Sequence, residues 1–193
     1  DQFSLVSLDG KILQNSKPIY LMMYKPKGVI SATKDKQHRT AIDILRDSSE
    51  LPITYDELEE LHIVGRLDLN STGLLLLTND SDWSKHLMSP ENKVEKVYEV
   101  AVEKPISNEC IKAFLEGMYF PFEGTTTKPA KLEKLSDTLA RVTLTEGKYH
   151  QIKRMFGRFR NPVLELHRIK IGKFEMGSEI KPGEIRSIIK EEV

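Results

Sequence analysis

Apolar residues follow two spacings along the chain, one typical of strands and one typical of helices. Short apolar or β-branched runs predict strands, because extended backbone presents such side chains to a core. The run at 73–78 is almost continuously apolar, which indicates a strand covered on both faces. The other expected strands lie at 19–24, 94–102, 130–135, 138–145 and 163–171.

Helices are predicted where apolar residues recur every three or four positions. In the stretch 149–159 one side is formed by Ile152, Met155, Phe156 and Phe159. Capping and stop residues favour shorter helices at 40–45, 80–90 and 107–117. Residues 43–60 hold seven acids and one base, so we expect an exposed loop over much of that segment.

Together, the many strands, several helices and hairpin-length connections predict an α+β fold with a mixed, largely antiparallel sheet. Residues 1–17 show a turn signal at Asp9-Gly10 but no apolar pattern long enough for a domain. We therefore expect 1–17 to be a linker and 18–193 to form the folded domain. A closing turn is predicted at 180–184, where proline and glycine interrupt the pattern.

Composition narrows the class of protein. The 193 residues are 39% hydrophobic and 30% charged, which is ordinary for a globular domain. A single cysteine, Cys110, excludes a disulfide framework and a cysteine-rich zinc site. No apolar run reaches the ~20 residues of a membrane span, and residues 1–20 lack the pattern of a signal peptide. We therefore expect a cytoplasmic protein with no membrane partner.

Basic residues are concentrated in one part of the chain, although the totals are equal at 29 basic and 29 acidic. Between Lys148 and Lys173 there are eight basic residues and one acid, so the rest carries 21 basic and 28 acidic residues. A local basic face on an otherwise acidic protein can orient a polyanion such as nucleic acid. A solvated basic helix without a partner is an equally weighted alternative.

The usual motifs for bound cofactors are missing from the sequence. There is no glycine-rich phosphate loop, no paired-histidine metal motif and no Gly-x-Ser-x-Gly nucleophile turn. The five histidines are scattered at spacings that do not resemble a zinc site. We therefore expect no metal and no cofactor, and a chemistry carried by ordinary side chains.

Asp68 stands out as a candidate reactive residue because of its position. It follows Arg66-Leu67 and precedes a small polar stretch that leads into the strand predicted at 73–78. A carboxylate on such a loop is held rigidly and stays reachable. Taken alone, Asp68 is more simply explained as a turn former whose side chain accepts hydrogen bonds from Ser71 or Thr72.

Two further stretches change that interpretation. Lys96-Val97-Tyr98-Glu99-Val100 places an aromatic ring beside a cation in a predicted strand. Residues 146–156, Glu-Gly-Lys-Tyr-His-Gln-Ile-Lys-Arg-Met-Phe, form a glycine-hinged approach to a basic helix. Alone, the first is typical of a core strand, and the second of a solvated or nucleic-acid-binding face.

In their order along the chain, Val64-Gly65-Arg66-Leu67-Asp68, Thr72-Gly73-Leu74-Leu75 and these two stretches resemble the pseudouridine synthases, over about residues 18–190. Within that superfamily the sequence resembles the ribosomal small-subunit branch, the RsuA family, at 127–130, 146–156, 165–168 and 181–184. The resemblance implies a mixed, mostly antiparallel sheet flanked by helices, in two halves with the active-site cleft between them. It also implies that residues 1–17 are the tail of an absent N-terminal S4-like RNA-binding domain.

The resemblance implies isomerisation of uridine within RNA: the bond from the sugar to N1 breaks, the base turns, and C5 joins the sugar. Asp68 would be the catalytic carboxylate, attacking the sugar carbon or the pyrimidine ring, two routes that the sequence leaves open. Lys153 would pair with Asp68 and keep it ionised. Tyr98 would stack on the uracil and help in proton transfer.

The remaining implied contacts concern substrate binding. Leu166 would form the apolar floor beneath the base, and Arg66 would help to hold the target nucleotide out of its stack. Six further residues are expected at the substrate or the RNA: Lys148, His150, Arg154, Arg158, Arg168 and Lys170. The expected partner is 16S rRNA or a small-subunit assembly intermediate, bound by a monomer.

Two other functions stay open at this point. A synthase for large-subunit (23S) rRNA would share the fold and Asp68 but would choose a different uridine. A ribosome-assembly factor would bind rRNA through the same basic stretch without needing catalysis.

Overall fold

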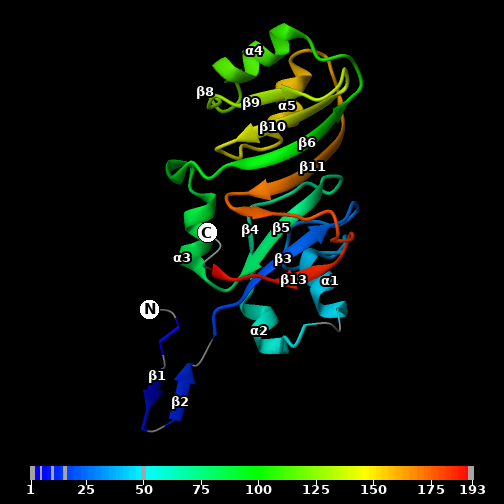
Figure 1. The fold of residues 1–193 in the computed structure, drawn as a ribbon. Helices are drawn as coiled ribbons and strands as arrows, with labels where there is room; N and C mark the ends of the chain where they lie inside the picture. The colour runs from blue at the N-terminus through cyan, green and yellow to red at the C-terminus, as the bar shows by residue number, and fades with distance from the viewer. Residues whose placement is uncertain (1–2, 5, 10, 15–16, 49–50, 191–193) are drawn as a thin grey trace.

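The computed structural model describes residues 3–4, 6–9, 11–14, 17–48 and 51–190. Its central feature is a nine-stranded sheet. The strand order is β13-β3-β5-β11-β6-β10-β9, with β4 also paired to β5 and β12 to β11. Figure 1 shows the sheet running through a lower and an upper half. The strands are β3 (Tyr20–Lys25), β4 (His62–Val64), β5 (Thr72–Thr78), β6 (Lys96–Val102), β9 (Lys131–Lys134), β10 (Leu139–Leu144), β11 (Val163–Ile171), β12 (Phe174–Glu175) and β13 (Ile185–Ser187).

Helices pack against the sheet in both halves (Figure 1). They are α1 (Ala41–Asp47), α2 (Tyr55–Glu60), α3 (Ser81–Met88), α4 (Asn108–Glu116) and α5 (Gln151–Gly157), with a 3-10 turn, η1 (Pro90–Asn92), after α3. Two short hairpins stand apart from the main sheet: β1 (Val6–Leu8) with β2 (Lys11–Gln14), and β7 (Tyr119–Phe120) with β8 (Thr125–Thr126).

The lower half is built on the two faces of β5. Leu75 and Leu77 belong to one core with the apolar residues of α1 and α2. Leu74 and Leu76 belong to another core with Trp83 of α3. None of the four leucines is exposed to solvent. The apolar run at 73–78 is therefore covered on both faces, as predicted.

The upper half has a core of its own beneath α4 and α5. The rings of Phe114 on α4 and Phe156 on α5 lie 4.8 Å apart between centroids. The predicted start of α4 is confirmed, because the Ser107 hydroxyl accepts from the Cys110 N–H. Each half can therefore hold its own strands while the cleft lies between them.

The halves meet where β5 pairs with β11, the only parallel pair among the described strands. Gly73 lies opposite Arg168 there, with a φ of 105°. A Cβ atom at Gly73 would lie 2.2 Å from the Arg168 carbonyl oxygen. Any side chain would force the two strands apart, so the junction requires glycine.

The predicted α+β class with a mixed, largely antiparallel sheet is confirmed. Strand β11 occupies the predicted range of 163–171. The closing turn is present through a 2.9 Å hydrogen bond from the Glu184 N–H to the Lys181 carbonyl. It leads into β13, a strand that the sequence did not predict.

The prediction of an exposed loop at 43–60 is wrong for residues 43–47 and 55–60, which belong to α1 and α2, whereas residues 51–54 are outside any helix or strand. Thr40 caps α1 and Thr54 caps α2, and each bonds reciprocally with the third residue of its helix, Asp43 or Glu57. The acids therefore complete capping boxes and stabilise helix N-termini. Leu58 of α2 is buried in the core of the lower half. Residues 49–50 lie outside the described residues.

The described part of residues 1–17 forms a hairpin in which β1 pairs antiparallel with β2. Gly10 of the predicted turn lies outside the described residues. The assignment of this segment to the tail of an S4-like domain stays a prediction.

Candidate active site

Residues 65–71, called here the Asp68 loop, connect β4 to β5. Leu67 donates its N–H to the Ser31 hydroxyl at 2.9 Å, and its carbonyl accepts from the same hydroxyl at 3.0 Å. The Asp68 carbonyl closes a turn by accepting from the Ser71 N–H at 3.0 Å. The turn therefore forms through the main chain, and the Asp68 carboxylate is left for other partners.

Those partners are two cationic or ionisable side chains from the upper half. Oδ2 of Asp68 accepts from Lys153 Nζ at 2.7 Å, and His150 Nε2 lies 3.2 Å from Oδ1. All three side chains are about one third exposed. The pair predicted between Asp68 and Lys153 is present, and His150 joins it.

A narrow pocket of ≈ 90 Å³ opens beside the carboxylate. Tyr98 from β6 and Leu166 from β11 supply a flat ring and an apolar surface, and Arg66 and Lys148 also line the pocket. Next to it lies a larger cleft of ≈ 660 Å³, lined by residues of both halves. The structure therefore brings together most of the side chains that the resemblance assigned to the substrate.

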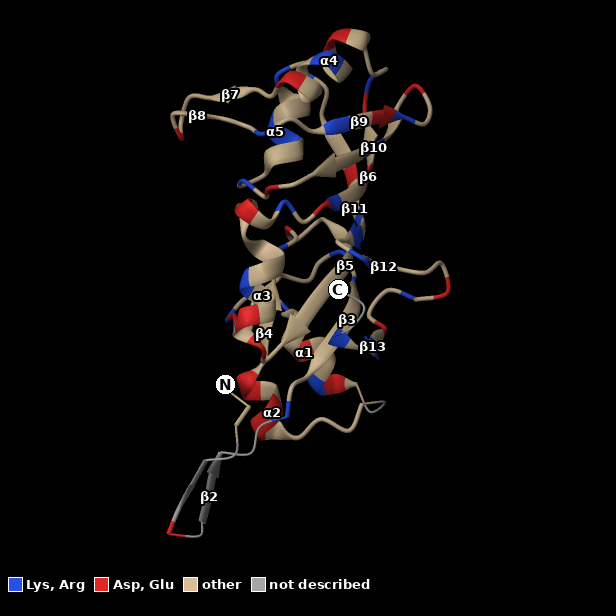
Figure 2. Cartoon of the chain, turned by 60° about the vertical axis from the view of Figure 1, so that its left-hand side comes forward, with Lys and Arg blue, Asp and Glu red and all other residues tan. Residues whose placement is uncertain are grey.

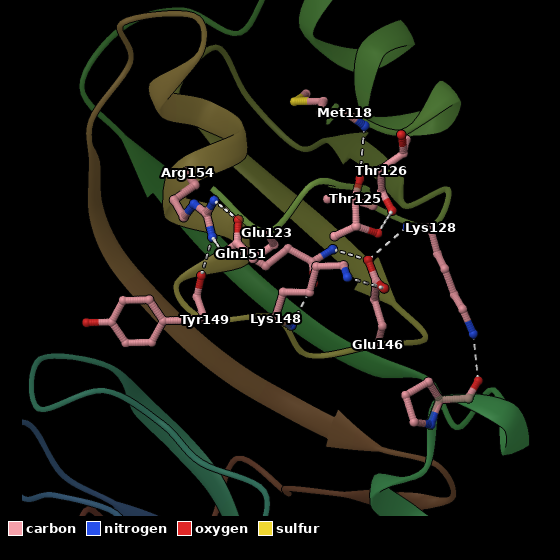
Figure 3. Close-up of polar contacts among 12 residues, drawn as sticks. Met118, Glu123, Thr125, Thr126, Lys128, Glu146, Lys148, Tyr149, Gln151 and Arg154 are labelled. Carbon is pink, nitrogen blue, oxygen red and sulfur yellow. Dashed lines mark hydrogen bonds and ion pairs between the residues drawn. The ribbon is translucent and has the colours of Figure 1, made fainter. Parts of the chain in front are cut away.

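Residues 146–151, called here the His150 turn, are organised by the buried carboxylate of Glu146 (Figure 3). Its Oε1 accepts from the Lys128 backbone N–H at 2.8 Å and from Gln151 Nε2 at 2.7 Å. Gln151 Oε1 in turn accepts from the Lys148 backbone N–H at 2.9 Å. One side chain thus fixes the segment that leads into α5.

This turn sets where α5 begins. His150 has a left-handed backbone with a φ of 48°, so the helix starts at Gln151 rather than at the predicted residue 149. The helix then places Lys153 at the carboxylate. The ring of Tyr149 stacks on the His150 ring, with 3.9 Å between centroids and 18° between planes.

Arg168 lies buried beneath the Asp68 loop, with only 3% of its surface exposed. Its Nε donates to the Leu74 carbonyl at 2.8 Å and its Nη1 to the Arg66 carbonyl at 3.3 Å, while the buried Nη2 has no partner among the described residues. The guanidinium also lies 5.9 Å from the Tyr98 ring centroid. This burial gives Arg168 a bracing position beneath the loop. Arg168 also lines the larger cleft, and its predicted contact with the substrate or the RNA stays a prediction.

Lys25 is a second buried cation that the sequence did not single out. Its Nζ donates to the Ser71 carbonyl at 2.7 Å and to the Pro26 carbonyl at 2.9 Å. Burial lowers the pKa of Lys25 to about 8, against the opposing attraction of Asp68. The only signal in the sequence is its place directly after the apolar run at 19–24.

Three of the basic residues predicted at RNA lie away from the carboxylate. Arg154 donates to both carboxylate oxygens of Glu123, at 2.7 Å for Nη2 (Figure 3). Its guanidinium lies 3.8 Å from the Phe120 ring centroid. Lys170 lies 4.0 Å from a Glu175 oxygen. Arg158 is exposed at the C-terminal end of α5.

The predicted basic face is largely neutralised in the fold. Four of the eight basic residues between 148 and 173 have a carboxylate within 4.0 Å, and a fifth is buried: Lys148, Lys153, Arg154, Lys170 and Arg168. Figure 2 shows blue and red positions interleaved along the molecule. Charge arranged along the sequence is therefore a poor guide to charge on this surface.

The arrangement suits reaction with a flat, polar ring. An ionised carboxylate beside an aromatic-lined pocket can act as a nucleophile or as a base. Within 3–190, in the ranges that the structure describes, no group of three or more His, Cys, Asp or Glu side chains could hold a metal ion. Across those same ranges, no helix is long and apolar enough to cross a membrane.

Comparison with known proteins supports the family that the sequence resembles. Residues 19–157 match the family described as RNA pseudouridylate synthase. The chain is 46% identical over 192 residues to ribosomal small subunit pseudouridine synthase A of Pseudomonas aeruginosa, covering 99% of this chain and 80% of that protein. It is 39% identical over 189 residues to the protein of the same name from Escherichia coli K12, covering 97% and 78%.

Solved structures agree on the fold. One described as "Crystal structure of pseudouridylate synthase" matches with a TM-score of 0.83 and 35% identity, covering all of this chain and 80% of that one. A chain of the archaeal box H/ACA Nop10-Cbf5 complex matches with a TM-score of 0.57 at 17% identity, which shows a shared fold alone. Because this family matches most of the chain, the chain belongs to the RNA pseudouridylate synthases and is an enzyme of that family.

Proposed function

We propose that this enzyme converts one specific uridine of small-subunit rRNA to pseudouridine, with Asp68 as the catalytic carboxylate. The observation that carries the proposal is the Asp68 carboxylate held by Lys153 at 2.7 Å beside the pocket of Tyr98. The similarity to small subunit synthases over nearly the whole chain supports the choice of rRNA. By resemblance, the target is uridine 516 of 16S rRNA.

The reaction is an isomerisation and balances within the nucleotide. The bond between the sugar C1′ and N1 breaks, the uracil turns, and C1′ joins C5. The proton on C5 leaves and N1 gains one, so no oxidant, reductant or transferred group is needed. An ionised carboxylate suits either attack on C1′ or attack on the pyrimidine ring.

The pocket supplies what the carboxylate needs. Partial burial would disfavour its charge, and the ammonium of Lys153 opposes that effect. Tyr98 offers a face on which the uracil stacks, a contact worth about 1–3 kcal/mol per base. Leu166 adds apolar surface to the same pocket. The target base enters only after it has left its own stack, at a cost of a few kcal/mol.

The test is to incubate the enzyme with 16S rRNA, alone and with bound ribosomal proteins, and to map pseudouridine in the products. We expect one new pseudouridine in at least one of the two small-subunit substrates. Mapping 23S rRNA in parallel separates the alternative target: modification there and not in 16S rRNA would contradict the proposal.

A further inference from the structure

The cleft beside the Asp68 pocket is larger than a single uracil requires, and one wall carries an exposed aromatic ring. The cleft has a volume of ≈ 660 Å³, against ≈ 90 Å³ for the pocket at the carboxylate. Tyr149 lines the cleft and is 65% exposed. In Figure 3 its ring points away from α5 and from the polar network around Glu146.

The main chain of Tyr149 is fixed although its ring is exposed. The carbonyl of Tyr149 accepts from Arg154 Nη1 at 3.3 Å, and the preceding residue is tied through its N–H to Gln151. One face of the ring is covered by the stacked imidazole of His150, which leaves the other face open. A ring held this way loses little conformational freedom when a ligand stacks on it.

The position of His150 links this ring to the reactive carboxylate. The imidazole contacts Asp68 at 3.2 Å and stacks on Tyr149 with 3.9 Å between centroids. A flat group on the open face of Tyr149 would therefore be the third ring of a stack that begins at His150, two stacking steps from the imidazole that contacts Asp68.

The chemistry of the walls fits a nucleotide, that is, a base together with its phosphate. Apolar side chains from the lower half, Ile30, Ile63 and Met88, line the cleft together with Tyr149. Lys148, next to Tyr149 in the chain, lines both the cleft and the pocket. Its ammonium lies 3.9 Å from a Glu146 oxygen, beyond hydrogen-bond distance, and so keeps donors for a phosphate. Aromatic faces and basic groups together are the usual means of holding single-stranded nucleic acid.

We propose that the open face of Tyr149 is a second stacking site, which binds the base of the nucleotide adjoining the target uridine. This inference rests on the proposed function, because it assumes that an RNA uridine occupies the Asp68 pocket. It assigns Tyr149 a binding role that the sequence did not predict, and it gives the enzyme a contact with sequence context outside the reacting base.

The test measures binding of a small-subunit rRNA fragment that the wild-type enzyme converts. Binding is measured in the Asp68→Asn background, so that turnover does not alter the RNA. Tyr149→Ala should weaken binding by about 5- to 150-fold, the range for one stacked base. Tyr149→Phe keeps the ring and should bind normally. Tyr55→Ala is the matched control, since Tyr55 is 67% exposed on α2 and outside the cleft.

The decisive arm replaces the nucleotide on either side of the target by an abasic one. One of the two abasic RNAs should bind the Asp68→Asn enzyme as weakly as intact RNA binds the Tyr149→Ala form. Tyr149→Ala should then add no further loss on that RNA. A full loss from Tyr149→Ala on both abasic RNAs, or a loss no larger than that of Tyr55→Ala, would overturn the stacking site. Failure of the wild type to convert any rRNA would instead refute the proposed function.

Discussion

The Asp68 loop and the His150 turn face each other across the cleft, but the fold holds them by different means. The Asp68 loop is anchored through its main chain: the carbonyls of Arg66, Leu69 and Ser71 and the amide of Leu67 all bond to groups outside the loop. The His150 turn is anchored mainly by the side chains of Glu146 and Gln151.

The difference suggests a division of labour. Main-chain anchors on several sides leave the Asp68 carboxylate little freedom, and small misplacements of reacting groups are costly. The opposite wall carries His150 and Tyr149 on a turn held by the side chains of Glu146 and Gln151, and Lys153 on the helix that follows. We therefore expect substitutions beneath the Asp68 loop to reduce turnover more than substitutions beneath the His150 turn.

Among substitutions of the residues that support the two walls, the largest effect is expected from Arg168→Met. The Arg66 carbonyl loses its donor two residues before Asp68, and a misplacement of about 1 Å can cost about 100-fold in rate. We predict a fall of that size in kcat, measured by single-turnover conversion of rRNA, with the protein still folded by its melting curve. Arg168→Lys should not restore activity, because lysine lacks the planar fork that reaches two carbonyls.

Arg46→Met on α1 is the matched control, since it removes an exposed arginine far from the cleft. Normal turnover of Arg168→Met would show that the loop keeps its geometry without this anchor.

Lys25 gives a pH-dependent effect on stability. Its pKa is lowered to about 8 in the folded state, from 10.5 when unfolded. Below pH 8 the amine is charged in both states, so burying it carries the full cost. Between pH 8 and 10.5 the unfolded chain binds more protons, and stability rises with pH. The unfolding free energy of the wild type should rise relative to Lys25→Met by about 2–3 kcal/mol across that window.

Urea unfolding at several pH values measures this difference, with Lys27→Met, at an exposed lysine, as the control. A difference that stays flat from pH 8 to 10.5 would show that Lys25 is not held in a depressed state.

Glu146→Ala should have a smaller effect on turnover than Arg168→Met. The Lys128 N–H and the Gln151 amide lose their acceptor, which costs about 1–3 kcal/mol of stability. Because water can replace part of the lost contact, we expect kcat to fall by about 10-fold. Glu133→Ala on β9 removes a half-exposed carboxylate as the control. A loss as large as that of Arg168→Met would erase the proposed contrast between the two walls.

The smallest effect concerns two arginines of α5 and its C-terminal end. Arg158 is exposed, whereas Arg154 already pairs with Glu123. If Arg158 contacts phosphate, Arg158→Ala should reduce the magnitude of the negative slope of log affinity against log salt by about one unit. Arg154→Ala should lower it less. Equal slopes for both variants would mean that Arg154 leaves Glu123 and contacts an RNA phosphate.

The sequence predicted those parts of the molecule that depend on local pattern. The apolar run of β5 and the length of β11 followed from side-chain spacing, and the carboxylate with its lysine followed from the family motifs. The helix α2 was missed because its acids were counted as charge, although Glu57 works as a cap. Local charge counts do not distinguish these two uses.

The supports of the site could not be predicted because they depend on distant pairings. Arg168 reaches Arg66 only because β11 lies beside β5. The sequence of a strand alone does not reveal which face of the strand is buried. The same limit applies to Lys25 and Glu146, whose hydrogen bonds join segments far apart in the sequence. Motifs located the reacting groups, whereas burial of the cations and carboxylate that brace them followed only from the fold.

The most direct test of the account is conversion of 16S rRNA by Asp68→Asn, with pseudouridine mapped at single-nucleotide resolution and RNA affinity measured in parallel. The substitution keeps the shape of the side chain and removes its charge. We predict that conversion falls below detection while affinity for the RNA stays within about twofold of the wild type. Substantial conversion by Asp68→Asn would contradict the assignment of Asp68 as the catalytic carboxylate.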